Sequence, residues 1–146
     1  MQPKKRLTGY MNGIISKLAI VAVVTCAQNS QAQEKIDERG WSEIINKTEF
    51  AGETEYFLPD NMRADIVTET HAYEVEWASK WKESIGQALY YAIHTERKPG
   101  VILLCNSSAK DKVSYLRLMT VASKYQISVM VVNTEKYLKE HEITRQ

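Results

Sequence analysis

The spacing of apolar and polar positions predicts alternating helices and strands beyond residue 33. Apolar side chains recur every three or four residues in four segments, which is the spacing of one helix face. The predicted helices cover residues 34–47, 79–95, 111–125 and 134–142. Short runs rich in β-branched and aromatic residues, which favour extended structure, lie between them. The predicted strands cover residues 55–58, 63–68, 72–77, 101–105 and 127–133.

The order of these elements predicts an α/β fold. The first three strands are consecutive, with turns at residues 59–61 and 69–71, and the second and third can pair as a hairpin around the later turn. VILLC and ISVMVVN are nearly continuous apolar runs separated by a helix, which is typical of buried parallel strands. The sequence therefore predicts a mixed sheet with helices on both faces. The Lys-Pro-Gly sequence at 98–100 is expected to break the preceding helix, and Ser107 or Ser108 to cap the next one.

Residues 1–32 have the pattern of a secretory signal peptide. Four positive charges precede a ten-residue apolar run at 18–27, which is shorter than the roughly 20 residues that span a bilayer. Small residues favour cleavage after Ala32, with cleavage after Ala27 or an uncleaved anchor as alternatives. Val-Val-Thr-Cys matches a lipoprotein signal poorly, so attachment at Cys26 is disfavoured. We expect a periplasmic or secreted protein whose single mature domain covers residues 33–146.

Composition constrains the kind of partner. The chain has 146 residues and a formal net charge of +1, but the first 32 residues hold four basic and no acidic residues. Residues 33–146 therefore carry 15 basic and 18 acidic residues, a net charge of −3. This balance argues against a large basic surface that coats nucleic acid and leaves room for a focused contact. Cys105 is the one cysteine of this part and is expected to be buried in an apolar strand.

Acidic residues gather on one face of the predicted hairpin. Alternation along the strand at 72–77 places Glu74 and Glu76 together, opposite Tyr73, Val75 and Trp77. Asp65 lies on the neighbouring strand and comes near Glu74 if the two strands pair. Buried carboxylates that repel one another favour a bound divalent cation, and hard oxygen ligands select Mg²⁺ or Mn²⁺.

A solvated sheet face is the alternative for these acids. There the carboxylates would pair with Arg63 or Lys80 and bind no metal ion. Trp77 and Trp81 have side chains that can stack on bases. We expect them to pack in the core instead, because Trp77 faces away from the acids and Trp81 lies on an apolar helix stripe.

The order of these residues resembles that of the PD-(D/E)XK nuclease superfamily. Asp65 in Arg-Ala-Asp-Ile-Val resembles its metal-binding aspartate, Glu74-Val-Glu76 resembles its acid-x-lysine motif, and Gln87 and Tyr91 match the QxxxY motif of some branches. The resemblance covers about residues 34–133. It implies a restriction-endonuclease-like αβββαβ core. One departure is that Glu76 stands where the family has lysine, a replacement that some restriction endonucleases share.

The resemblance implies a Mg²⁺-dependent (or Mn²⁺-dependent) nuclease. Asp65 and Glu74 would hold the metal, with Glu76 as a further ligand or water-orienting base and Lys80 on the phosphate. The residues implied in binding nucleic acid are Arg63, Lys82, Gln87 and Tyr91. Glu55 and Glu43 are weaker candidates for an additional acid.

Three functions follow for this chain. The first is an exported nuclease that acts on nucleic acid, with DNA favoured over RNA, and a homodimer is compatible with the superfamily. The second is a nuclease-fold module in the cell envelope that has lost catalysis and binds a partner, as the missing lysine suggests. The third is a structural envelope protein whose acids are merely solvated.

Overall fold

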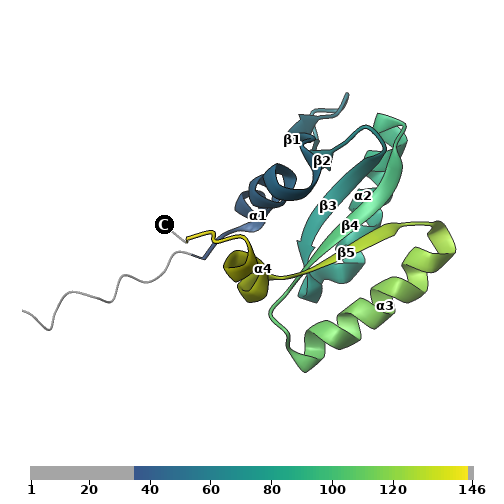
Figure 1. Cartoon of the computed structure of the whole chain (residues 1–146). Helices are drawn as coiled ribbons and strands as arrows, with labels where there is room; N and C mark the ends of the chain where they lie inside the picture. Colours follow the sequence, from purple (N-terminus) through teal and green to yellow (C-terminus); the bar gives the residue numbers. More distant parts are fainter. Residues whose placement is uncertain (1–34, 145–146) are drawn as a thin grey trace, which may run out of the picture. The chain divides into compact units, whose positions relative to one another are not determined.

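The computed structural model describes residues 35–144, which form a five-stranded sheet between helices (Figure 1). The predicted signal peptide at 1–32 lies outside the described residues. The helical elements are α1 (Glu38–Ile45), η1 (Asn46–Phe50), η2 (Ala78–Lys80), α2 (Trp81–Thr95), α3 (Ala109–Tyr125) and α4 (Thr134–Glu140). The strands are β1 (Glu53–Phe57), β2 (Arg63–Val67), β3 (His71–Trp77), β4 (Lys98–Cys105) and β5 (Ser128–Asn133).

The sheet is mixed and its strands lie in chain order, β1-β2-β3-β4-β5. The first three pair antiparallel through hairpins, whereas β3, β4 and β5 pair parallel through the helical crossovers α2 and α3. Both the α/β class and the mixed sheet with flanking helices are therefore confirmed. Strand β3 is the point of change, since it has an antiparallel neighbour on one side and a parallel neighbour on the other.

Each face of the sheet is covered by a different pair of helices. Helices α1 and α4 pack on the face that carries Tyr73 and Val75, with Trp41 and Tyr137 as their large buried side chains. Helices α2 and α3 cover the opposite face, where Leu118 meets the small and aliphatic residues of β4. Alternation along β3 therefore assigns the faces as predicted, with the apolar residues on one side and Glu74 and Glu76 on the other.

The first helix differs from its prediction over 34–47 at both ends. It begins at Glu38 because Asp37 acts as the N-cap, its Oδ1 accepting a hydrogen bond from the Gly40 amide at 2.8 Å. At the other end the chain continues through the π-helical turn η1 and stops at Ala51, which has the left-handed φ of 53°. Periodicity did not reveal the wider turn, because its residues keep part of the same apolar spacing.

Residues 98–100 do not form the predicted break but belong to β4. Helix α2 ends at Thr95, as predicted, and the reversal comes from its C-cap Glu96, which has a φ of 55° and donates its amide to the Ala92 carbonyl. Pro99 is tolerated within β4 because it lies opposite Ala72 and one residue before the first β5 pair, at Gly100. The missing Pro99 amide thus removes no hydrogen bond to β5.

Two further expectations concern single residues. Ser108 caps α3 as predicted, in a capping box with Asp111. Cys105 is buried, as expected of a small apolar side chain, and burial raises the pKa of its thiol to about 11. Among residues 35–144, no helix combines the length and the apolar character needed to cross a bilayer.

Close packing at Gly100 yields a stability prediction. Gly100 pairs with Tyr73, and a Cβ at Gly100 would overlap the Tyr73 ring. We expect Gly100→Ala to lower the free energy of unfolding by roughly 1–3 kcal/mol, as overpacking does. Denaturant unfolding measures this change.

Gly86 supplies the matched control. It lies within α2, and a Cβ there would meet nothing within 4 Å. Gly86→Ala is therefore expected to stabilise the protein by about 1 kcal/mol through helix propensity. Equal effects of the two substitutions would contradict this account of Gly100.

Candidate active site

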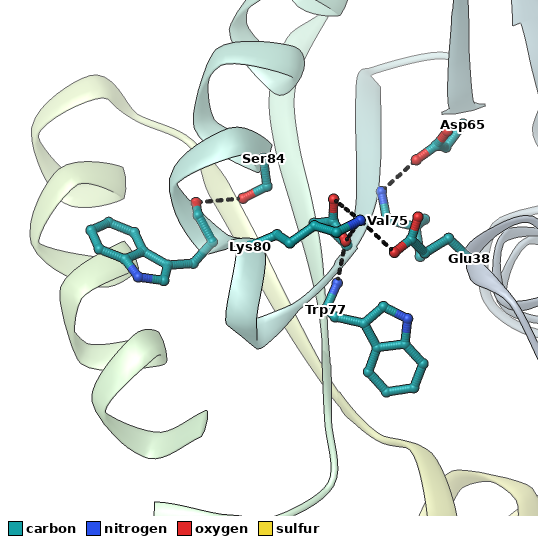
Figure 2. A network of polar contacts seen from close by, with 8 residues as sticks. Glu38, Asp65, Val75, Trp77, Lys80 and Ser84 are labelled. Carbon is teal, nitrogen blue, oxygen red and sulfur yellow. Dashed lines mark hydrogen bonds and ion pairs between the residues drawn. The ribbon is translucent and has the colours of Figure 1, made fainter. Parts of the chain in front are cut away.

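Asp65 lies where β2 and β3 separate. The two strands pair at Val67–Ala72 and Ile66–Tyr73, and the next residue along β2 is Asp65. Its Oδ2 accepts a hydrogen bond from the Val75 amide at 2.7 Å (Figure 2). The Asp65 side chain thus takes the place of a backbone carbonyl of β2 as the partner of this β3 amide. The carboxyl group of Asp65 is thereby held between the strands, beside Glu74.

Glu74 is a buried acid next to a second acid. Only 4% of its surface is exposed, and its Oε2 is a buried atom without a hydrogen-bond partner among the described residues. Burial, followed by the charge of Asp65, raises the pKa of Glu74. Burial also raises the pKa of Asp65, although less, because the Val75 amide stabilises its charged form. The pair therefore holds a proton that isolated carboxyls would have released at neutral pH.

Helix α2 supplies the polar neighbours of this pair. The nearby hydroxyl of Tyr91 lowers the pKa of Glu74 and so partly opposes the effect of burial on that carboxyl. Burial and the two acids in turn raise the pKa of Tyr91, so its hydroxyl remains a proton donor. Gln87, one turn earlier on α2, forms a polar contact with Tyr91. The predicted Gln87–Tyr91 pair is thus next to the predicted acids.

Glu76 belongs to a second group of charges at the end of β3. Its Oε1 accepts a hydrogen bond from the Trp77 amide at 2.8 Å, and the Lys80 ammonium lies 3.4 Å away. The same ammonium lies 3.1 Å from Oε1 of Glu38, so it bridges two carboxylates in Figure 2. Burial and the nearby Glu38 raise the pKa of Glu76 to about 7. Contact with Glu38, more than with Glu76, raises the pKa of Lys80.

Glu38 is the residue of this site that sequence reasoning missed. It is the first residue of α1, and its charge acts on both Asp65 and Glu76. The weaker candidate from the same helix, Glu43, is instead exposed and pairs with Arg39 at 3.4 Å. The N-cap Asp37 places Glu38 in the first turn of α1, but no local pattern indicates that this turn packs beside Lys80.

Two predicted binding residues lie apart from the acids. Arg63 forms a 2.8 Å ion pair with Glu55, whose charge also contributes to raising the pKa of Asp65. Lys82 is exposed and extends over the ring of Trp81, with its ammonium 5.8 Å from the centroid. The structure therefore brings Lys80, not Lys82, to the carboxylates.

The donors suit a hard divalent cation. Among residues 35–144, no three acidic, histidine or cysteine side chains converge closely enough to hold an ion by themselves. Mg²⁺, however, usually takes one or two carboxylates and completes its shell with water and substrate phosphates. Asp65 and Glu74 supply such a pair, and the unpartnered Glu74 Oε2 is a buried oxygen that a cation would satisfy.

Comparisons with protein-family models, with curated proteins and with solved structures find no match for this chain.

The raised carboxyl pKa values predict how stability depends on pH. A carboxyl whose folded pKa exceeds its unfolded value binds more protons in the folded state, so the free energy of unfolding falls as pH rises between those two values. For the wild type we expect this contribution to fall from about pH 5 to about pH 9. Glu74→Gln removes the largest part of it and should stabilise the protein by roughly 1–3 kcal/mol at the alkaline end. Chemical denaturation across this pH range measures both effects.

Glu69→Gln is the control, because Glu69 is an exposed acid in the turn before β3. It also removes one carboxylate but should leave the pH profile unchanged. If the Glu69→Gln and Glu74→Gln profiles coincide, the acid pair does not destabilise the folded state.

Proposed function

We propose that this protein is a metal-dependent hydrolase of phosphodiester bonds in nucleic acid, with DNA favoured over RNA. The observation that carries the proposal is the pair formed by buried Glu74 and partly buried Asp65, with an unpartnered carboxylate oxygen and a lysine bridge at the adjoining strand end. The α-β-β-β-α-β order around it is the order of the PD-(D/E)XK core that the sequence resembles. Perturbed acids gathered in this way are typical of reaction sites.

Asp65 and Glu74 are the residues that would hold Mg²⁺ or Mn²⁺. When bound, the cation would lower the pKa of a water molecule and neutralise charge on the scissile phosphate. Asp65 is oriented for this role by the Val75 amide, and Glu74 by the Tyr91 hydroxyl. Glu76, with a pKa of about 7, is suited to accept a proton near neutral pH.

Lys80 would supply the positive charge that the family draws from its motif lysine. The side chain comes from the end of η2 rather than from β3, yet its ammonium reaches the carboxylate of Glu76 at the motif position. A lysine there stabilises charge that develops on a phosphate oxygen. Tyr91 would position Glu74, and Gln87 would position Tyr91, which lies between Gln87 and the acid.

The same bridge favours a second candidate, a nuclease-fold module that binds a partner without cleaving it. Lys80 is already paired with two carboxylates, and this pairing neutralises the charge that a phosphate would need. In either case an exported location rests on the predicted signal peptide. A homodimer is also compatible with either candidate, since superfamily members often dimerise.

Metal titration and cleavage distinguish these candidates. We expect Mn²⁺ to bind the wild-type protein in calorimetric titration, alone or with a phosphorothioate oligonucleotide present, and to support cleavage of DNA. Glu74→Gln should abolish both binding and cleavage because it removes a buried ligand. The control, Glu69→Gln, should retain both. Metal-dependent cleavage that survives Glu74→Gln would overturn the assigned site, and metal-independent binding without cleavage would support the second candidate.

Two neighbouring lysines test the role of Lys80. Lys80→Met should lower kcat by roughly 10²–10³-fold, as loss of one charge-stabilising donor does. Lys82→Met removes the same charge two residues away, where the side chain lies over Trp81, and should leave kcat nearly unchanged. Steady-state cleavage rates measure both variants. Equal losses of kcat in the two variants would indicate that each lysine contributes only through the overall electrostatic potential of the protein.

A further inference from the structure

A cavity of about 360 Å³ lies at the carboxyl ends of the parallel strands. Trp77 ends β3, Asn106 follows β4, and Thr134 follows β5, and all three line it. Ile36 and Trp41, before and within α1, complete its apolar side. Crevices at this end of open α/β sheets are common ligand sites, and the volume lies within the range of small-molecule pockets.

The cavity adjoins the candidate active site through the backbone of Trp77. The Trp77 amide donates to Glu76, whereas its indole ring extends away from the Glu38–Lys80–Glu76 bridge in Figure 2. The ring is only partly buried, because one side packs on the core beneath α1 and α4 and another lines the cavity. The expected core role of Trp77 therefore describes one part of the ring only.

The lining combines an aromatic surface with one donor and one acceptor. The Thr134 hydroxyl donates a hydrogen bond to Oδ1 of Asn106 at 2.9 Å. The Asn106 side-chain NH₂ group therefore points away from Thr134 and remains a donor. Glu135, exposed at the start of α4, adds a carboxylate acceptor. Every nucleobase presents a donor beside an acceptor on its pairing edge and has a face that stacks on indole.

We infer that this cavity binds one unpaired nucleobase, stacked on Trp77 with its pairing edge toward Asn106 and Glu135. The inference rests on the proposed function and adds the substrate class: a single strand, or a strand with one base turned out of its helix. A base paired within a duplex has its edge occupied and cannot bind in this way. The adjoining phosphate would then lie toward the Lys80 end of the site.

Lys35 completes the lining of the cavity with an exposed positive charge. Its ammonium lies 4.6 Å from the centroid of the Trp77 ring, and the side chain is exposed. A cation–π contact at an exposed position is weaker than base stacking, so a base displaces the ammonium from the ring. The released charge remains close enough to pair with the phosphate of the same nucleotide.

Binding without metal tests the cavity separately from catalysis. The probes are a fluorescein-labelled single-stranded oligodeoxynucleotide and its duplex, titrated with the full chain in EDTA and followed by anisotropy. We expect wild type and Glu69→Gln, which changes an exposed acid in the turn before β3, to bind the single strand alike. Trp77→Leu, which keeps the apolar packing, should bind it roughly tenfold more weakly, whereas Trp77→Phe should retain most of the affinity. Duplex binding should not change in either variant.

Asn106→Asp is the second variant, because the exposed Asn106 side chain can be changed without altering the core. It replaces the donor by a negative charge and should also weaken single-strand binding. The cavity assignment is overturned if wild type does not bind the single strand, or if Trp77→Leu and Asn106→Asp bind it as wild type does. Neither outcome bears on metal-dependent cleavage, whose loss in Glu74→Gln is measured independently. Failure of the cavity and failure of the proposed hydrolase are therefore separate results.

Discussion

The packing of a buried acid, Glu74, against a partly buried one, Asp65, where two strands separate is the constraint on which the rest of this structure depends. Carboxylates lose hydration when they leave water, and that cost persists unless protons, cations or hydrogen bonds offset it. Asp65 accepts a hydrogen bond from the Val75 amide, and the nearby Tyr91 hydroxyl partly offsets the burial of Glu74, yet Oε2 of Glu74 has no hydrogen-bond partner among the described residues. A protein that retains such a pair in its sheet gives up stability at neutral pH, and the metal-dependent reaction that we propose would account for its presence.

The topology around β3 makes that burial possible. Antiparallel pairing with β2 ends after two residue pairs, while parallel pairing with β4 continues along the whole strand. Beyond Tyr73, the edge of β3 that faces β2 therefore has backbone groups free to bond to side chains, as the Val75 amide does with Asp65. Helix α2 returns over the same face, so its polar residues meet the acids, and the apolar face remains for α1 and α4. The site thus lies where the β2–β3 pairing is interrupted, and the continuous β3–β4 pairing holds β3 in place.

Charge balance then extends from the buried pair to the carboxyl ends of the strands. Lys80 bridges Glu38 and Glu76, and Trp77 joins this bridge to the neighbouring cavity through its backbone. Acids, lysine and aromatic ring thus follow one another within a few residues of the β3 terminus. The mildly acidic character of residues 33–146 is compatible with this arrangement, because the contact with nucleic acid that we propose lies at one end of the sheet rather than over a broad basic surface.

The sequence by itself determined the order of the elements, the two faces of β3 and the approach of Asp65 to Glu74. These features follow from local periodicity and from hairpin pairing between neighbouring strands. The tertiary structure alone decided that Glu38 joins the acids, that Lys80 rather than Lys82 faces them, and that Trp77 borders a cavity. Each of these depends on how the end of a helix packs beside the carboxyl ends of the strands, which is set by helix caps and by packing between distant segments. Periodicity assigns a side chain to a face, but only the packed fold determines which side chains of different elements meet.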